Sequence, residues 1–405
     1  MNAAPAGAST WRLAAVLGLL SAVGPFAIDM YLPALPEIEA DLGASVAATQ
    51  ATLTAFFLAF GLAQLLYGPL ADRFGRKPPL YVGLALFAAA SLGCAMAPSV
   101  GWLTALRFLQ GLGGAAVMVV PRAVIRDLHT GPSATRLMAT VMLVISVSPM
   151  LAPLAGSALV AFGDWRIIFA ALAVVAVAGL ALTAFALPET LVPARRTPID
   201  AASLWRGART LLGDRTFMGL TLIGGFAMAS FFVFLASASF VYAGQFGLSP
   251  TGFSLAFAIN AVGFFGASQL AATLGERHGE RRVVARAVTG FASCTLVLLG
   301  LVLAGLGTLP VIVGMLFLAN ACLGLVIPTT MVMALDAHGE IAGLASSLGG
   351  TLQMLAGGLM ITAASPFFDG TATPMVAAIA LCGVLAFALS RRLFARDPAP
   401  LPGAA

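Results

Sequence analysis

The sequence predicts an all-α polytopic membrane protein, with twelve transmembrane helices arranged as two pseudo-symmetric six-helix bundles. Composition, the spacing of apolar runs and one repeated charged turn lead to this prediction. Of the 405 residues, 60% are hydrophobic and only 9% are charged, whereas soluble domains carry about 25% charged residues. The composition therefore excludes a soluble globular protein.

Apolar runs of membrane-spanning length follow one another along the whole chain. A helix needs about 20 mostly apolar residues to cross a bilayer. The expected spans cover residues 12–36, 46–71, 78–97, 100–124, 134–161, 165–187, 216–242, 250–274, 282–305, 308–335, 341–367 and 373–394. An even number of spans places both termini on the same side of the membrane.

The longest polar stretch, residues 190–215, lies between the sixth and seventh spans. It divides the chain into an N-terminal bundle (1–189), a cytoplasmic linker (190–215) and a C-terminal bundle (216–405). Leu204 and Trp205 stand among basic residues in this linker. Part of it is therefore either an amphipathic helix on the membrane surface or a solvated connection.

A charged turn follows the second span and returns after the eighth. Residues 68–77 read G-P-L-A-D-R-F-G-R-K, and residues 272–281 read A-T-L-G-E-R-H-G-E-R. The acid, the arginine after it and the later glycine keep their spacing in both copies. A duplicated turn indicates two similar halves, and membrane proteins built from two such halves are typically transporters.

Charge placement predicts the orientation. The net charge is +5, and the basic residues gather at alternate ends of the apolar runs, with Arg166 alone on the opposite side. This asymmetry places both termini in the cytoplasm and argues against a nucleic-acid partner. The cysteines and histidines form no metal-binding or disulfide pattern, and no phosphate-binding loop is present, so we expect neither a metal nor ATP.

Asp29 is the one carboxylate clearly inside an apolar run, where an unpaired charge is costly and a functional role is expected. Arg107 lies at a similar depth in the fourth span, because both are about 7 Å from the midplane at 1.5 Å per residue. We expect the two to pair. Burial favours the protonated carboxyl and a nearby cation favours the ionised one, so Asp29 is a candidate proton carrier. The alternative is a static structural ion pair.

The turn at 68–77 is expected to act as a gate. A carboxylate is attracted to a helix N-terminus, so Asp72 is predicted to dock on the start of the eleventh span and hold the halves together. Arg126 is expected to add a salt bridge. The predicted gate residues are Gly68, Asp72, Arg73, Gly75, Arg76 and Arg126.

The expected cavity carries aromatic, methionine and amide side chains, which suit apolar drug-sized cargo with few polar anchors. The predicted contacts are Tyr31, Gln50, Phe57, Gln110, Met138, Met142, Phe231, Phe234, Asn260, Asn320 and Gln353. The alternative for each is a position facing lipid or packed between helices.

Four motifs carry a family resemblance: residues 68–77, the L-x3-R-x2-Q-G-x-G-G-A run at 103–115, D-M-Y-L-P-A-L-P at 29–36 and L-P-E-T at 187–190. Together they resemble the major facilitator superfamily, and most closely its bicyclomycin-resistance (Bcr/CflA) subfamily of drug:proton antiporters, to which amphenicol exporters are related.

The resemblance implies proton-coupled efflux of small amphipathic drugs, such as amphenicols or bicyclomycin-like compounds, by a monomer in the bacterial inner membrane. It implies Asp29 as the proton carrier with Arg107 as its partner, and the proton gradient as the energy source without a cofactor. The antiporter motif of the fifth span, at Pro149, Pro153 and Gly156, departs from the family pattern, because two of its three glycines are replaced.

Of three alternative functions, one stays open and two lack support in the sequence. A proton-coupled importer or exporter of a native metabolite has the same chemistry and stays open. A membrane-embedded enzyme lacks a nucleophile–base set within the spans. A receptor or scaffold would have no need of a buried acid.

Overall fold

The computed structural model describes residues 10–128, 131–196, 198, 200–336 and 338–395, and these contain helices and turns but no strand. Within them, twelve segments are helical, long and apolar enough to cross a membrane, so the predicted all-α, twelve-span class is confirmed. The chain forms two compact units, which are described separately. One comprises the described residues up to 201 together with 247–258, and the other comprises 202–246 together with those from 259 on.

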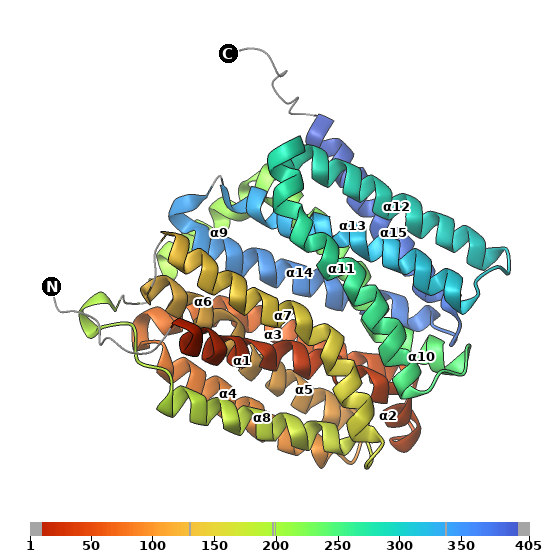
Figure 1. The fold of residues 1–405 in the computed structure, drawn as a ribbon, viewed down its shortest axis with the longest axis horizontal. Helices are drawn as coiled ribbons and strands as arrows, with labels where there is room; N and C mark the ends of the chain where they lie inside the picture. Colours follow the sequence, from red (N-terminus) through yellow and green to blue (C-terminus); the bar gives the residue numbers. More distant parts are fainter. Residues whose placement is uncertain (1–9, 129–130, 197, 199, 337, 396–405) are drawn as a thin grey trace. The chain divides into compact units, whose positions relative to one another are not determined.

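The first unit contains the helices of the first six spans (Figure 1). They are α1 (Thr10–Asp29), α2 (Leu35–Asp41), α3 (Val46–Phe74), α4 (Lys77–Ala95), α5 (Val100–Gly114), α6 (Ala116–Leu128), α7 (Gly131–Val160) and α8 (Arg166–Phe185). Helix α3 packs against α5, α4 against both α5 and α8, and α1 against α7.

Two of these spans are broken, as their prolines and glycines lead one to expect. The first span ends as α1 at Asp29, and a 3-10 turn at Leu32–Ala34 leads into α2. Pro33 and Pro36 lack the N–H groups that would continue the helix. The fourth span divides at Ala115, directly after Gly114 and before α6. The predicted first span, residues 12–36, is therefore present with a break near its prolines, and it extends to Asp41.

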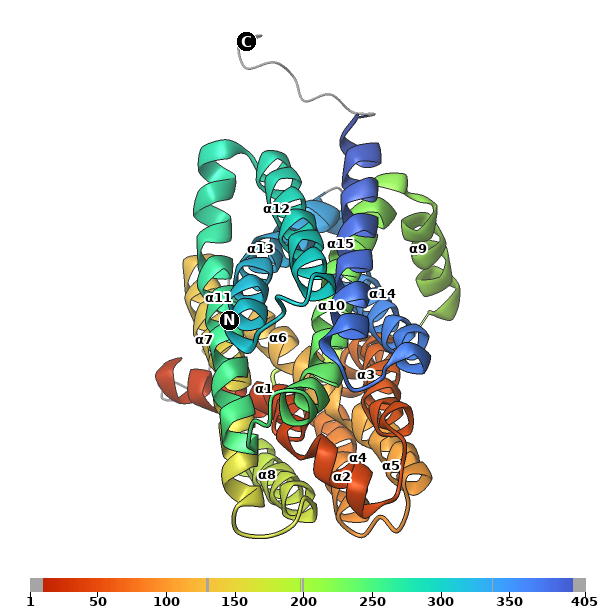
Figure 2. The same ribbon diagram turned by 90° about the vertical axis from the view of Figure 1, so that its right-hand side faces the viewer.

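The second unit contains the remaining spans. They are α10 (Arg215–Gly244), α11 (Pro250–His278), α12 (Glu280–Leu303), α13 (Leu309–Asp336), α14 (Ala342–Ala364) and α15 (Ala372–Ala395), with the start of α11 grouped in the first unit. Helix α10 packs against α14 and α15, and α12 packs against α13 and α15 (Figure 2).

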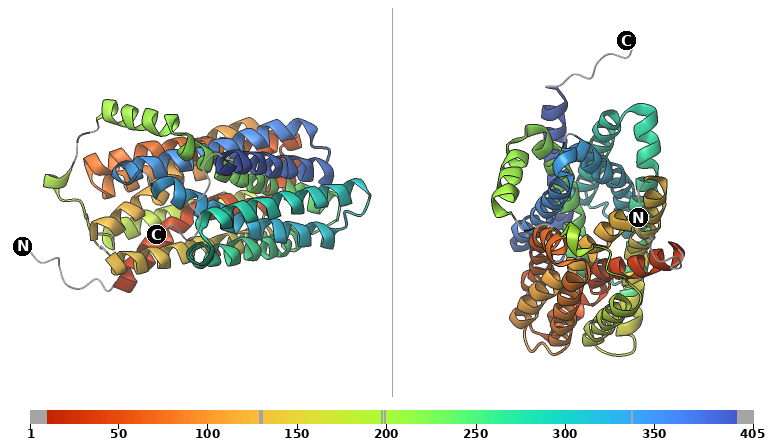
Figure 3. Two further views of the ribbon diagram at one scale, coloured as in Figure 1. Left: turned by 90° about the horizontal axis from the view of Figure 1, so that it is seen from above. Right: turned by 90° about the vertical axis from the view of Figure 1, so that its left-hand side faces the viewer.

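The predicted linker contains α9 (Ala201–Gly213), a helix separate from α10 (Figure 3). Leu211 on α9 is buried, whereas Trp205 is 68% exposed. The helical alternative is therefore correct for this part of the linker. Its position on a membrane surface stays a prediction.

Candidate functional site

Asp29 is the last residue of α1, where the chain leaves the helix for the turn at Met30 and Tyr31. The residue is only 4% exposed. Among the described residues, no side chain or backbone group forms a hydrogen bond or ion pair with its carboxylate. The Asp29 side chain is therefore held at the broken end of a membrane helix by packing alone.

Arg107 is fully buried on α5. Its Nη1 donates to the Ala27 carbonyl oxygen at 3.0 Å and to Gln110 Oε1 at 2.5 Å. The expected ion pair with Asp29 is absent, which corrects the prediction. Matching depth places two side chains at one level of the membrane, but the rotation of each helix decides whether they meet, and here Arg107 meets the backbone two residues before Asp29.

Aromatic rings surround the Arg107 guanidinium. Its central carbon lies 4.4 Å from the ring centroid of Phe56 on α3, 4.8 Å from that of Tyr31 and 5.9 Å from that of Phe169 on α8. A desolvated cation gains about 2 kcal/mol from such a ring. This cage lowers the cost of burying a charge that has no carboxylate beside it.

A second layer of hydrogen bonds fixes the cage. Tyr31 Oη donates to Thr52 Oγ1 at 2.7 Å, because the Thr52 hydroxyl itself donates to the Thr49 carbonyl oxygen at 2.6 Å. Gln110 Nε2 donates to Ser91 Oγ at 2.7 Å. Tyr31 and Gln110, predicted as cargo contacts, therefore hold Arg107 in place in this structure.

The guanidinium is not fully satisfied. Arg107 Nε and Nη2 are buried and have no hydrogen-bond acceptor. Such groups are rare in folded proteins and call for an explanation. An acceptor that arrives in another state of the protein, such as a carboxylate or a polar cargo atom, would satisfy them.

Gly156 of the predicted antiporter motif lies against the turn that follows Asp29. A Cβ atom built at Gly156 would overlap the carbonyl oxygen of Met30. The motif's Pro149 and Pro153 are buried on α7. Gly156, the glycine of this motif that the chain keeps, is therefore a point at which the backbones of α7 and of the turn after α1 are in contact.

The gate turn is built around Arg76, between α3 and α4. Arg76 Nη1 bonds Asp72 Oδ1 at 2.6 Å, and its Nε and Nη2 bond the two carboxylate oxygens of Asp127 at 2.7 and 3.0 Å. Burial alone would lower the pKa of Arg76, but hydrogen bonds to Asp127 and Asp72 outweigh it and raise the pKa above its ordinary value. The guanidinium therefore stays charged.

Glu189 completes the turn from the chain segment after α8. Its Oε1 accepts the Arg76 N–H at 2.9 Å, and its Oε2 accepts the Lys77 N–H at 3.1 Å, so it caps the start of α4. Gly75 has a φ of +97°, a conformation that glycine adopts without strain. No sequence pattern pointed to a role for Asp127, and Glu189 stood out only as part of the L-P-E-T motif.

Three gate predictions have other outcomes. Arg126 is exposed and forms no salt bridge with Asp72, whose described partner is Arg76. Arg73 is exposed and its guanidinium lies over the ring of its neighbour Phe74, 5.2 Å from the centroid. A Cβ at Gly68 would meet no atom within 4 Å. Docking of Asp72 on the eleventh span stays a prediction.

The remaining predicted cargo contacts are distributed over both units. Gln50 and Phe57 on α3 are buried, whereas Met138 and Met142 on α7 are half-buried. In the second unit, the Phe231 ring stacks on the Phe264 ring, with the ring centroids 5.5 Å apart. Asn320 Nδ2 donates to Asn260 Oδ1 at 3.4 Å. Phe234 and Gln353 are buried. Their contact with cargo stays a prediction.

Comparison with known proteins places these features in a family. Residues 17–361 match the model of the Major Facilitator Superfamily. The MFS-type transporter YdgK of Bacillus subtilis is 36% identical over 95% of this chain and 96% of its own. A bicyclomycin resistance protein homolog of Haemophilus influenzae is 32% identical over 96% and 98% of the two chains.

A solved D-xylose–proton symporter shares the fold, with a TM-score of 0.75 and 17% identity over 94% of this chain and 97% of its own. The sequence relatives confirm the resemblance carried by the four motifs. This chain belongs to the major facilitator superfamily of transporters, and to the part of it that includes drug-resistance proteins.

Proposed function

We propose that the chain exports small amphipathic drugs across the bacterial inner membrane in exchange for protons, by alternating access. The relative named for bicyclomycin resistance and the aromatic, methionine and amide side chains of the candidate residues support this cargo class. Amphenicols and bicyclomycin-like compounds are the first cargoes to test. In this proposal the protein works as a monomer without a cofactor, and both termini lie in the cytoplasm.

Asp29 is the proton carrier. The observation that carries this assignment is a side chain 4% exposed whose carboxylate has no hydrogen bond or ion pair to any described residue. An unpaired charge is costly inside a membrane protein, and uptake of a proton removes that cost. Because the carboxyl has no ion pair in the described part of the structure, its proton can leave whenever one side of the protein opens to water.

Arg107 couples that proton to movement. Nη1 binds the Ala27 carbonyl in the last turns of α1, whereas Nε and Nη2 have no acceptor. We infer that these two N–H groups receive the Asp29 carboxylate when it ionises and release it when it is protonated. The contact between α1 and α5 then depends on the proton.

One exchanged proton supplies enough free energy for modest accumulation of a neutral drug. A proton moving down the membrane potential supplies about 2.3 kcal/mol per 100 mV, in addition to the pH gradient.

The ion-pair cluster around Arg76, with Asp72 as the expected contact to the other half, closes the cytoplasmic side while the proton enters from outside.

The test uses Asp29→Asn in proteoliposomes with an imposed pH gradient. Glu39→Gln, a half-buried acid on α2, is the matched control. We expect Asp29→Asn to bind drug but to lose uphill accumulation, and Glu39→Gln to pump normally. Drug added to parent vesicles should move protons in the opposite direction.

Uphill pumping by Asp29→Asn at the parental rate would contradict the proton assignment. Protons that move together with the drug would contradict antiport and favour the importer alternative. Pumping that persists after the proton gradient is collapsed would contradict proton coupling altogether.

A further inference from the structure

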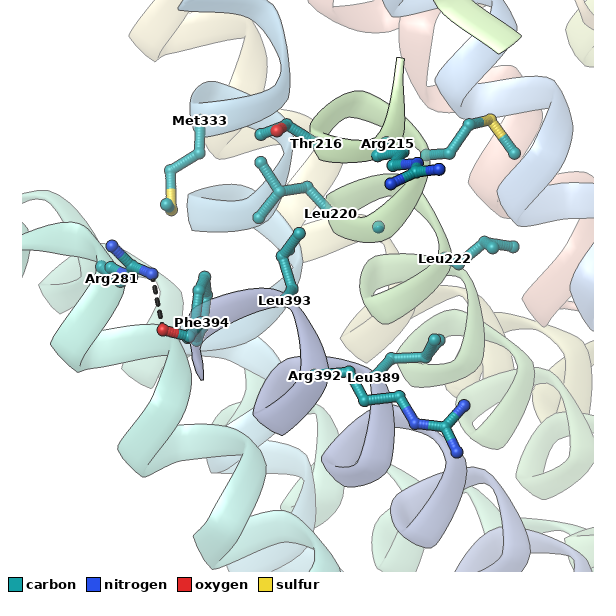
Figure 4. Close-up of a pocket in the computed structure, with 12 residues that line it drawn as sticks. Arg215, Thr216, Leu220, Leu222, Arg281, Met333, Leu389, Arg392, Leu393 and Phe394 are labelled. Atoms are coloured by element: carbon teal, nitrogen blue, oxygen red, sulfur yellow. Dashed lines mark hydrogen bonds between the residues drawn. The ribbon is translucent and has the colours of Figure 1, made fainter. Parts of the chain in front are cut away.

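A pocket of about 570 Å³ lies within the second unit, outside the residues assigned to proton or cargo (Figure 4). Four helices contribute to it, namely the starts of α10 and α12 and the ends of α13 and α15. These ends belong to one side of the membrane by the parity of the spans, and the charge asymmetry predicts that this side is cytoplasmic.

Three arginines line the pocket, each from a different helix: Arg215 on α10, Arg281 on α12 and Arg392 on α15. No aspartate or glutamate is among the described lining residues. Asp214, next to Arg215 in sequence, accepts the N–H groups at the start of α10 and also pairs with His338. The lining is therefore strongly positive.

The arginines differ in what holds them. Arg281 Nη2 donates to the Phe394 carbonyl oxygen at 2.8 Å, and its guanidinium lies 5.0 Å from the Phe394 ring centroid. Arg215 and Arg392 form no hydrogen bond or ion pair with another described residue. Arg281 is thus part of the wall, while the other two guanidinium groups can bind an incoming anion.

Apart from Thr216, the rest of the lining is apolar. Leu220, Leu389 and Leu393 form the wall next to the arginines. Sites for drug-sized molecules occupy about 300–1,000 Å³, so the pocket has room for a phosphate group with its glycerol and the first methylenes of an acyl chain. A small inorganic anion would leave the leucine wall without a partner.

We propose that this pocket binds the headgroup of an anionic glycerophospholipid of the cytoplasmic leaflet. The charges of Arg215 and Arg392, on two different helices, attract the phosphate into the pocket, and the upper acyl chain lies along Leu389 and Leu393. Basic pockets between transmembrane helices on the cytoplasmic side suit such headgroups, and each arginine near an anionic lipid adds about fivefold in affinity. The bilayer supplies this ligand at high local concentration.

The experiment is native mass spectrometry of the full chain in detergent, titrated with phosphatidylglycerol or with phosphatidylcholine of the same acyl chains. Arg215→Gln/Arg392→Gln removes the two unpaired cations. Arg282→Gln/Arg391→Gln removes two exposed arginines that are adjacent in sequence to lining residues but do not line the pocket. Both variants carry the same net charge.

We expect the parent and the control variant to retain phosphatidylglycerol over phosphatidylcholine, and the pocket variant to lose about tenfold or more in phosphatidylglycerol affinity. Equal loss in both variants would show general surface attraction and overturn the site. Equal retention of both lipids by the parent, or displacement of lipid by millimolar inorganic phosphate, would overturn the choice of an anionic lipid.

Discussion

The charged turn at 68–77 and its copy at 272–281 share a backbone and differ in their charges. Gly75 and Gly279 have φ angles of +97° and +83° at matching positions. In the first turn, Arg76 binds two carboxylates. In the second, Glu280 stands in its place and forms no ion pair with a described residue.

One further contact is common to both turns. Lys77 Nζ donates to the Ala184 carbonyl oxygen, near the end of α8, at 3.2 Å. Its counterpart Arg281 donates to the Phe394 carbonyl oxygen, near the end of α15, at 2.8 Å. A cation at a helix C-terminus satisfies carbonyl groups that have no partner within the helix.

The difference separates two roles of one motif. The positive-φ glycine and the cation at the end of the last helix occur in both units, so they belong to the architecture of a six-helix bundle. Among the described residues, a carboxylate cluster of this kind surrounds Arg76 and has no counterpart at the second turn, so it belongs to something that only the first turn does. Gating is the role that we propose for it.

The largest expected effect is from Arg76→Gln, which removes the cation from Asp127, a side chain only 15% exposed. Because Asp72 is 53% exposed and contributes little, the free energy of unfolding should fall by about 2 kcal/mol, mostly from the lone Asp127 charge. Thermal unfolding in detergent measures this.

Glu280→Gln is the matched control at the equivalent position, and its effect should stay within about 0.5 kcal/mol. Adding Asp127→Asn to Arg76→Gln should restore part of the lost stability, because it removes the unpaired charge. Equal destabilisation by Arg76→Gln and Glu280→Gln would remove the distinction between the two turns.

The second effect comes from the two glycines. Alanine at a positive φ costs about 1 kcal/mol in either turn. At Gly75 the new Cβ would also lie 2.7 Å from Glu189 Oε2, whereas at Gly279 it would meet nothing within 4 Å. Gly75→Ala should therefore lower the unfolding temperature clearly more than Gly279→Ala, and the reverse order would contradict the capping role of Glu189.

The spans were predictable because the length of an apolar run is local information. The run at 46–71 forms α3, which extends to Phe74. Pro33 and Pro36 predict an interruption of the first span, but not that α1 ends at Asp29, because a proline is compatible with either a kink or an end.

The contacts of the site were less predictable because they join distant segments. Asp127 meets Arg76 across 51 positions, and in sequence it is one more acid at the end of a span. Arg107 faces the Ala27 carbonyl and three aromatic rings. The rotation of each helix about its axis decides these contacts, and the depth of a residue in the membrane does not reveal that rotation.

The third prediction concerns pH, since Asp214 Oδ2 and His338 Nε2 lie 2.8 Å apart in the second unit. Partial burial would raise the pKa of Asp214, but hydrogen bonds from Thr216, Phe217 and His338 outweigh it and hold the pKa below its ordinary 3.8. A lowered folded-state pKa means that the stabilisation is complete above about pH 4 and is lost as the pH falls through the folded pKa.

Asp214→Ala should therefore cost about 1 kcal/mol at neutral pH, and this cost should shrink as the pH falls from about 4 through the folded-state pKa of Asp214. Thermal unfolding of both proteins across this range measures the difference, and Glu276→Ala, at an exposed acid on α11, controls for general effects of acid. A cost that is constant with pH would show that the Asp214 charge makes no contribution.

The smallest effect tests the shared contact. Lys77→Met and Arg281→Met each remove a cation from the end of α8 or α15 while keeping an unbranched side chain, and each should cost about 0.5 kcal/mol. Equal losses would support a duplicated architectural contact, measured by unfolding at low salt, where such attractions are strongest. A much larger loss for Lys77→Met would instead indicate that Lys77 acts together with the Arg76 cluster. Lys77 would then belong to the gating part of the motif and not to its architectural part.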